Sequence, residues 1–143
     1  MADSTTSDIT IEASAAEVMA VIADFEAYPQ WTGAVKSAEV LSRFPDERAE
    51  RVRYQLSAGV ITDEYTLAYQ WDGQTKVSWS LVEGQVLRAM DGSYTLTETG
   101  GRTHVRYELT VEVRIPMIGM IRRKAEKVIV DTALKELKKR VEG

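Results

Sequence analysis

The chain has 143 residues, a formal net charge of −4, 44% hydrophobic residues and 28% charged residues. These values are typical of one soluble domain with a real core, and the acidic balance argues against a nucleic-acid-binding protein. Cysteine is absent, which excludes disulfides and cysteine nucleophiles. No apolar run reaches the ~20 residues of a membrane span, and no signal peptide is visible. We therefore expect a cytoplasmic protein without a transmembrane segment.

The beginning of the chain predicts one strand followed by two short helices. Residues Thr5–Ile11 alternate between apolar and polar and predict a strand. Ser14 and Glu17 have the spacing of a capping box, which indicates the start of a helix. Pro29 cannot continue that helix, so a break or a second short helix should follow, with Trp31 at the break.

Alternation with a period of two begins at Val35 and predicts six further strands separated by turn signals. Their expected ranges are 35–44, 49–58, 61–71, 76–83, 86–98 and 103–115. The adjacent apolar residues Val40 and Leu41 indicate a bulge in the first of them. Short turns between consecutive strands favour antiparallel pairing with one solvated face.

The last segment, Pro116 to Glu142, predicts one helix of roughly 35–40 Å. A helix of this length needs a partner of equal size, so the seven strands should form one curved antiparallel sheet that wraps it. The expected fold is therefore α+β, a single domain over residues 1–143 with two short helices after the first strand. The apolar stripe expected to face the sheet consists of Ile118, Ile121, Ala125, Val128, Ile129, Thr132, Leu137 and Val141.

The same helix carries eight basic and four acidic residues, whereas the rest of the chain is net acidic. A basic helix can make transient contact with a membrane surface. A solvated helix face whose cations complement the helix dipole accounts for the same charges.

Aromatic residues dominate the strand face that we expect to point inward. A dry core favours aliphatic residues, because a buried phenol needs a partner for its O–H. Rings with hydroxyl tips suit a partly wet, amphipathic pocket, although the same rings can also fill a core with their hydroxyls at its edge. The inward aromatic residues are Tyr54, Tyr65, Tyr69, Trp71, Trp79, Tyr94 and Tyr107.

Three charged residues share the parity of this inward face: Asp63, Glu83 and Arg88. A carboxylate beside an arginine in an apolar pocket can polarise a carbonyl or remove a proton from an activated carbon. The alternative is that all three lie in solvent at strand ends, where Gly84 can shift the register. His104 should face water, and no metal or nucleotide motif is present.

Four stretches, Ile11–Val18, Phe25–Trp31, Val77–Gly84 and Gly92–Leu96, resemble the START-like (SRPBCC) superfamily in its bacterial polyketide cyclase/dehydrase and lipid transport branch. Similar proteins are the coenzyme-Q-binding START-domain proteins and the carriers that resemble the birch-pollen allergen. The Tyr-Pro-x-Trp segment that ends at Trp31 is the most specific match. The resemblance implies a helix-grip fold with a deep cavity for an apolar or aromatic ligand between the sheet and the long helix.

Three functions follow as hypotheses from the residues and the resemblance. The first is binding or transport of a small hydrophobic ligand such as a lipid, an isoprenoid quinone, a polyketide or a steroid, without a cofactor or metal. The second is an aromatic polyketide cyclase/dehydrase that uses an inward carboxylate, and the third is a co-chaperone or interaction module. The sequence specifies neither the ligand nor the oligomeric state. The expected gate is Arg114 to Gly119 with the segment from Tyr28 to Trp31, and the expected ligand-binding residues are Trp31, Tyr54, Tyr65, Tyr69, Trp79, Met90, Tyr94, Tyr107, Met117, Met120 and Ile121.

Overall fold

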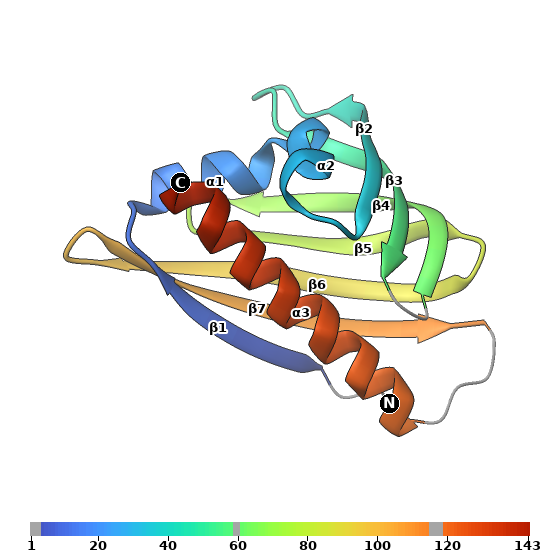
Figure 1. Cartoon of the computed structure of the whole chain (residues 1–143). Helices are drawn as coiled ribbons and strands as arrows, with labels where there is room; N and C mark the ends of the chain where they lie inside the picture. Colours follow the sequence, from blue (N-terminus) through green and yellow to red (C-terminus); the bar gives the residue numbers. More distant parts are fainter. Residues whose placement is uncertain (1–3, 59–60, 115–118) are drawn as a thin grey trace.

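The computed structural model describes residues 4–58, 61–114 and 119–143, and for residues 58, 61 and 119–122 it describes the backbone alone. Seven strands form one antiparallel sheet, and a long C-terminal helix lies across one face of it (Figure 1). The predicted helix-grip fold is thereby confirmed. In chain order the elements are β1 (Thr5–Ile11), α1 (Ala15–Ala23), a 3₁₀ turn (Phe25–Ala27), α2 (Tyr28–Trp31), β2 (Val35–Arg43), β3 (Ala49–Ala58), β4 (Ile61–Asp72), β5 (Lys76–Gly84), β6 (Leu87–Thr99), β7 (Arg102–Val113) and α3 (Gly119–Glu142).

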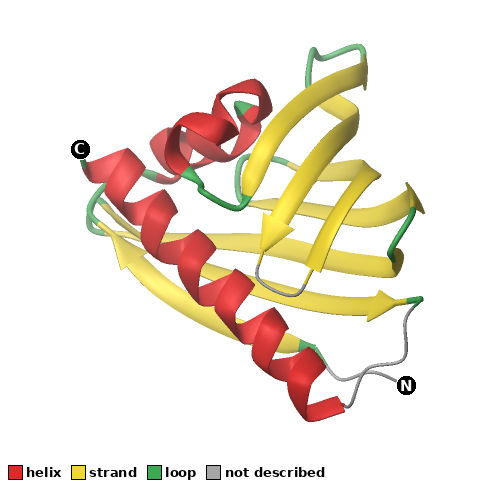
Figure 2. Cartoon of the chain, turned by 45° about the vertical axis from the view of Figure 1, so that its right-hand side comes forward, coloured by secondary structure: helices red, strands yellow, loops and turns green. Residues whose placement is uncertain are grey.

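The strands from β2 to β7 follow one another as hairpins, and β1 pairs with β7, which gives the order β1-β7-β6-β5-β4-β3-β2. The sheet curves around the layer of helices (Figure 2). The bulge expected in β2 is present, because the pairing with β3 shifts between Val40 and Ser42. The pairing also shifts in the β4–β5 pair, next to Gly84, where a register shift was expected, and in the β6–β7 pair between Leu87 and Ala89.

The short helices form where the sequence indicates. The Ser14 hydroxyl accepts a hydrogen bond from the Glu17 N–H at 3.2 Å and caps α1. It also donates to the Glu17 carboxylate at 3.3 Å. Pro29 lies in the first turn of α2, where its missing N–H costs no hydrogen bond.

The long helix α3 packs against β1, β7, α1 and α2. Its fully buried residues are Val130, Leu134, Leu137 and, unexpectedly, Glu126. The predicted stripe is correct at Leu137, which is fully buried, and at Ala125, Ile129 and Val141, which pack against the core, but Val128 is 56% exposed and Thr132 is also exposed. The reason is that the helix covers the β1–β7 edge of the sheet and turns a second face toward the remaining strands. The predicted start at Pro116 lies outside the described residues.

Glu126 joins α3 to the sheet through its carboxylate. One oxygen accepts the Val111 N–H from β7 at 2.6 Å, and the other accepts the Thr5 hydroxyl from β1 at 2.9 Å. A buried carboxylate is tolerated when hydrogen-bond donors satisfy it in this way. The apolar periodicity of the helix could not reveal this position, because the residue that fills it is charged.

Candidate ligand-binding cavity

A cavity of about 330 Å³ lies between the inner face of the sheet, α2 and α3. Its exposed rim includes Gly33, Ser57, Val128 and Thr132, so the opening lies between the α2–β2 connection, the end of β3 and one face of α3. The inner wall consists of buried rings, namely Tyr54, Tyr65, Tyr69, Trp79, Tyr94 and Tyr107.

The strand register brings these rings together. Tyr54 is paired with Tyr65, and Tyr94 with Tyr107, at directly opposite positions of neighbouring strands. The ring centroids of these pairs lie 5.4 Å and 4.6 Å apart. Trp79 lies 5.5 Å from Tyr94 and 5.6 Å from Tyr107, which continues the cluster across β5. Packing of this kind adds about 0.5–1.5 kcal/mol per pair and makes the wall stiff.

The phenol groups make this apolar wall partly polar. The hydroxyls of Tyr54 and Tyr69 form a hydrogen bond with each other. The hydroxyls of Tyr65, Tyr94 and Tyr107 take part in none of the hydrogen bonds between described residues, and they are not among the enclosed atoms that lack a partner. Burial raises the pKa of all three tyrosines above the usual value near 10, so the wall presents neutral O–H groups at physiological pH.

Most of the predicted ligand-binding residues lie on this wall or at its rim. They are Trp31, Tyr54, Tyr65, Tyr69, Trp79, Met90, Tyr94 and Tyr107. Met117 lies outside the described residues, as do the side chains of Met120 and Ile121 and most of the expected gate segment before α3. Trp71 does not line the cavity: it packs against Tyr69, and its indole N–H donates to the Ala49 carbonyl at 2.8 Å.

Asp63 is buried, as its parity predicts, but it does not line the cavity. Its carboxylate accepts hydrogen bonds from the backbone N–H groups of Glu64, Gln85 and Leu87 at 2.7, 3.1 and 2.9 Å. Asp63 therefore stabilises the turn between β5 and β6 by accepting hydrogen bonds from its backbone.

Glu83 and Arg88 lie in solvent, which is the alternative that the sequence left open beside an inward orientation. Both side chains are exposed, and Arg88 forms a 3.2 Å ion pair with Glu112 on the outer face. The two irregular pairings explain this exposure. On β5, Leu81 pairs with Leu67 and Glu83 pairs with Thr66, which leaves Val82 without a partner on β4. On β6, Arg88 has no partner on β7. An extra residue reverses the alternation on one side of a bulge.

Glu136 is a charged residue at the cavity that the sequence did not indicate. Its side chain borders the cavity from α3, and its Oε2 accepts the Gly33 N–H at 3.2 Å. Its Oε1 is buried and has no hydrogen-bond partner in the described structure. In the sequence it resembles any other charge on the solvated face of a basic helix.

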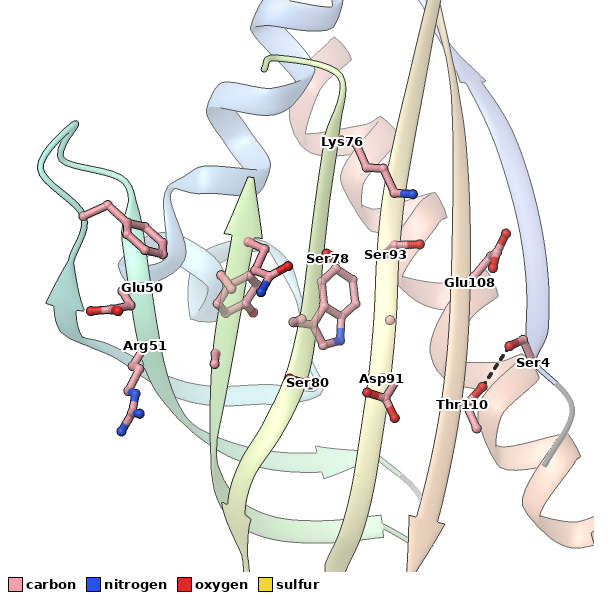
Figure 3. Close-up of a pocket in the computed structure, with 16 residues that line it drawn as sticks. Ser4, Glu50, Arg51, Lys76, Ser78, Ser80, Asp91, Ser93, Glu108 and Thr110 are labelled. Carbon is pink, nitrogen blue, oxygen red and sulfur yellow. Dashed lines mark hydrogen bonds between the residues drawn. The ribbon is translucent and has the colours of Figure 1, made fainter. Parts of the chain in front are cut away.

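The opposite face of the sheet carries a broader hollow of about 650 Å³ (Figure 3). Short polar and charged residues line it, such as Ser78 and Ser80 on β5 and Asp91 and Ser93 on β6. This hollow is open to water and largely polar, so it offers little to an apolar molecule. In the described part of the chain, no helix is long and apolar enough to cross a membrane, and no group of acidic or histidine residues is arranged to hold a metal ion.

Comparison with known proteins gives one family and several similar folds. Residues 11–138 match the family described as polyketide cyclase / dehydrase and lipid transport. The structure of a START superfamily protein from Mycobacterium smegmatis is similar with a TM-score of 0.91 and 24% identity over 97% of each chain. The Zhui aromatase/cyclase from Streptomyces sp. R1128 is similar with a TM-score of 0.80 and 15% identity over 98% of this chain and 93% of that one. No curated protein matches the chain. At these identities the structural likeness concerns the fold.

Proposed function

Because this chain belongs to the polyketide cyclase/dehydrase and lipid transport family, we propose that it binds and carries one small, largely apolar molecule in the cavity between the sheet and α3. The observation that supports this most directly is the inner wall. Its buried rings leave space between sheet and helix, and three of its hydroxyls have no partner among the described residues. A bound molecule supplies both the missing apolar contacts and the missing hydrogen-bond partners.

The size of the cavity favours a compact ligand. A volume of about 330 Å³ is near the lower end of the range of roughly 300–1,000 Å³ for small-molecule pockets. This volume suits an aromatic polyketide or the ring of an isoprenoid compound better than an extended two-chain lipid. The wall offers neutral phenols, which hydrogen-bond to carbonyl or hydroxyl groups of such a molecule.

A carrier function fits the residues of the inner wall better than a cyclase that uses Asp63, Glu83 or Arg88 as its acid or base. Ring closure in a polyketide needs an acid or base beside the reacting carbon. Asp63 is engaged by three backbone N–H groups, and Glu83 and Arg88 point away from the cavity. The aromatic wall, in contrast, needs no charged group to bind an apolar molecule.

The test is binding of the neutral fluorophore N-phenyl-1-naphthylamine to a variant with a filled cavity. Ala133 lines the cavity and is half-buried, so Ala133→Trp places an indole in the space. Lys139→Trp is the matched control, since it adds the same indole to an exposed position of α3 that does not border the cavity. We expect saturable binding that weakens at least about tenfold in Ala133→Trp and stays within about twofold of wild type in Lys139→Trp.

Equal binding by both variants would place the fluorophore on the surface and would favour an interaction module. The melting temperature of each variant is measured in parallel. A loss of binding then counts only where the fold is intact.

A further inference from the structure

The solvent-facing side of α3 carries a line of lysines. Lys124, Val128, Thr132, Lys135 and Lys139 follow one another at intervals of three or four residues, so they share one face of the helix. All five are exposed, and we call them the lysine ridge. The ridge contains no acidic residue.

The acidic residues of α3 lie off the ridge and are engaged within the protein. Glu126 is buried, and Glu136 accepts the Gly33 N–H at 3.2 Å. The other two acids form ion pairs with lysines one turn earlier in the helix, at 3.0 and 2.6 Å. None of the ion pairs between described residues includes a lysine of the ridge, so the positive charge of the ridge faces solvent.

This charge is segregated from the rest of the molecule. The chain has 18 basic and 22 acidic residues, of which α3 holds eight and four, so α3 carries +4 and the remainder −8. A helix dipole favours cations only near the C-terminal end of a helix. Arg123 and Lys124 lie near the beginning of α3, whose first turn contains no acidic residue. The dipole alone therefore does not account for the basic side of α3.

The lysine ridge borders the cavity opening. Val128 and Thr132 belong both to the ridge and to the residues that line the cavity. On the other side of the opening, Lys36 is exposed and donates to the carbonyl of Gly33 at 3.1 Å. Positive charge therefore lies on both sides of the opening.

We propose that the lysine ridge docks this protein on an anionic lipid bilayer with the cavity opening turned toward the headgroups. Lysines are attracted to anionic headgroups, whereas the acidic remainder of the molecule is repelled, which sets the orientation. Val128 is the one apolar residue of the ridge, so the contact is mainly electrostatic and reversible. Docking does not depend on an occupied cavity. Its consequence, that an apolar ligand passes between bilayer and cavity without crossing water, rests on the carrier function proposed above.

Cosedimentation with vesicles tests the docking. We expect binding to vesicles of equal parts phosphatidylcholine and phosphatidylglycerol, and affinity at least about tenfold weaker for phosphatidylcholine alone. Raising the salt from about 0.05 M to about 0.5 M should weaken binding at least about tenfold, because the Debye length shortens. The same loss is expected for the combined ridge variant Lys124→Gln, Lys135→Gln and Lys139→Gln.

The matched control changes the net charge equally on the opposite face of the sheet. Its three positions are exposed and lie more than a Debye length from a bilayer that contacts α3, so its affinity should stay within about threefold of wild type. The control combines Arg51→Gln, Lys76→Gln and Arg88→Gln.

A fluorescent label gives the orientation. The chain has no cysteine, so Val128→Cys and Val82→Cys each accept a single nitrobenzoxadiazole label. Both residues are exposed, but Val82 lies on β5 and does not border the cavity. Anionic vesicles should shift the emission of the label to the blue at position 128 and leave it unchanged at position 82.

Three results would overturn the proposal: no preference of wild type for anionic vesicles, an equal loss of binding in the control and ridge variants, or an emission shift at position 82 alone. Retention on poly-L-glutamate without binding to vesicles would also overturn it and would assign the ridge to an acidic protein partner. The ridge variant should bind N-phenyl-1-naphthylamine as wild type does, and Ala133→Trp should still bind vesicles. Failure of docking and failure of the carrier function are thereby distinguishable.

Discussion

The aromatic wall depends on the absence of one side chain, that of Gly92. This residue lies directly opposite Trp79 in the β5–β6 pair. A Cβ atom at position 92 would lie 2.4 Å from Cζ2 and 2.6 Å from Nε1 of the indole. Ordinary van der Waals contacts between carbon atoms are about 3.5–4.0 Å. The Gly92→Ala variant must therefore displace the ring by about an ångström or more.

The ring has little freedom to move. Its centroid lies 5.8 Å from that of Tyr69, 5.5 Å from Tyr94 and 5.6 Å from Tyr107, so neighbouring rings must move with it. Overpacking of this kind costs about 1–3 kcal/mol. The entropy of unfolding for a domain of this length is about 0.3 kcal/mol per kelvin, so the melting temperature should fall by about 3–10 °C.

Thermal unfolding followed by circular dichroism measures this loss, with Gly33→Ala as the matched control. A Cβ at Gly33 meets no atom within 4 Å, so that variant should melt within about 1 °C of wild type. In a Trp79→Phe background, Gly92→Ala should cost less than half of its effect in wild type, because the atoms in conflict are gone. An unchanged melting temperature for Gly92→Ala, or full additivity with Trp79→Phe, would refute this account of the wall.

Three further predictions concern buried polar groups. Glu126→Ala leaves the Val111 N–H unpaired and should lower the free energy of unfolding by about 2–4 kcal/mol. Urea titrations measure this loss, and a loss below about 0.5 kcal/mol would contradict the buried contact. Asp63→Ala should lower the free energy of unfolding by a similar amount, because three backbone N–H groups lose their acceptor. Its affinity for N-phenyl-1-naphthylamine should stay within about twofold of wild type, and weaker binding by a stable variant would show that Asp63 contacts the ligand. Burial raises the pKa of every tyrosine, so the contribution of the phenols to stability should be constant below pH 10, where folded and unfolded phenols are both protonated. Above pH 10 stability should fall by up to about 1.4 kcal/mol per pH unit for each residue. Phenolate absorbance that precedes the loss of circular dichroism would argue against this burial of Tyr28, Tyr54, Tyr65, Tyr69, Tyr94 and Tyr107.

The sequence predicts the elements well because each strand has a solvated outer face and an apolar inner face. That alternation placed Tyr54, Tyr65, Trp79 and Tyr94 on the inner face, where the structure has them. It failed at Arg88, since a bulge inserts one residue through backbone geometry that leaves no trace in hydrophobicity.

The orientation of α3 was harder to predict for a different reason. Apolar residues occur on two faces of this helix, and one fully buried position is occupied by Glu126. A prediction of one apolar stripe merges the residues of both faces, and it leaves out Glu126 because that residue is charged. The position of Glu136 beside the cavity is hidden in the same way, because only the tertiary contact with Gly33 distinguishes it from the solvated charges.

The two faces of α3 also explain why a cavity exists. Val130, Leu134 and Leu137 bury one face in the core, alongside the carboxylate that joins the helix to β1 and β7. The second face, with Val128 and Ile129, borders the cavity across from the aromatic wall. Tilting the helix to close that space would break both hydrogen bonds of the buried carboxylate, so collapse of the cavity is opposed by the loss of a satisfied charged group. A ligand that covers Val128, which is 56% exposed, gains hydrophobic free energy without that loss.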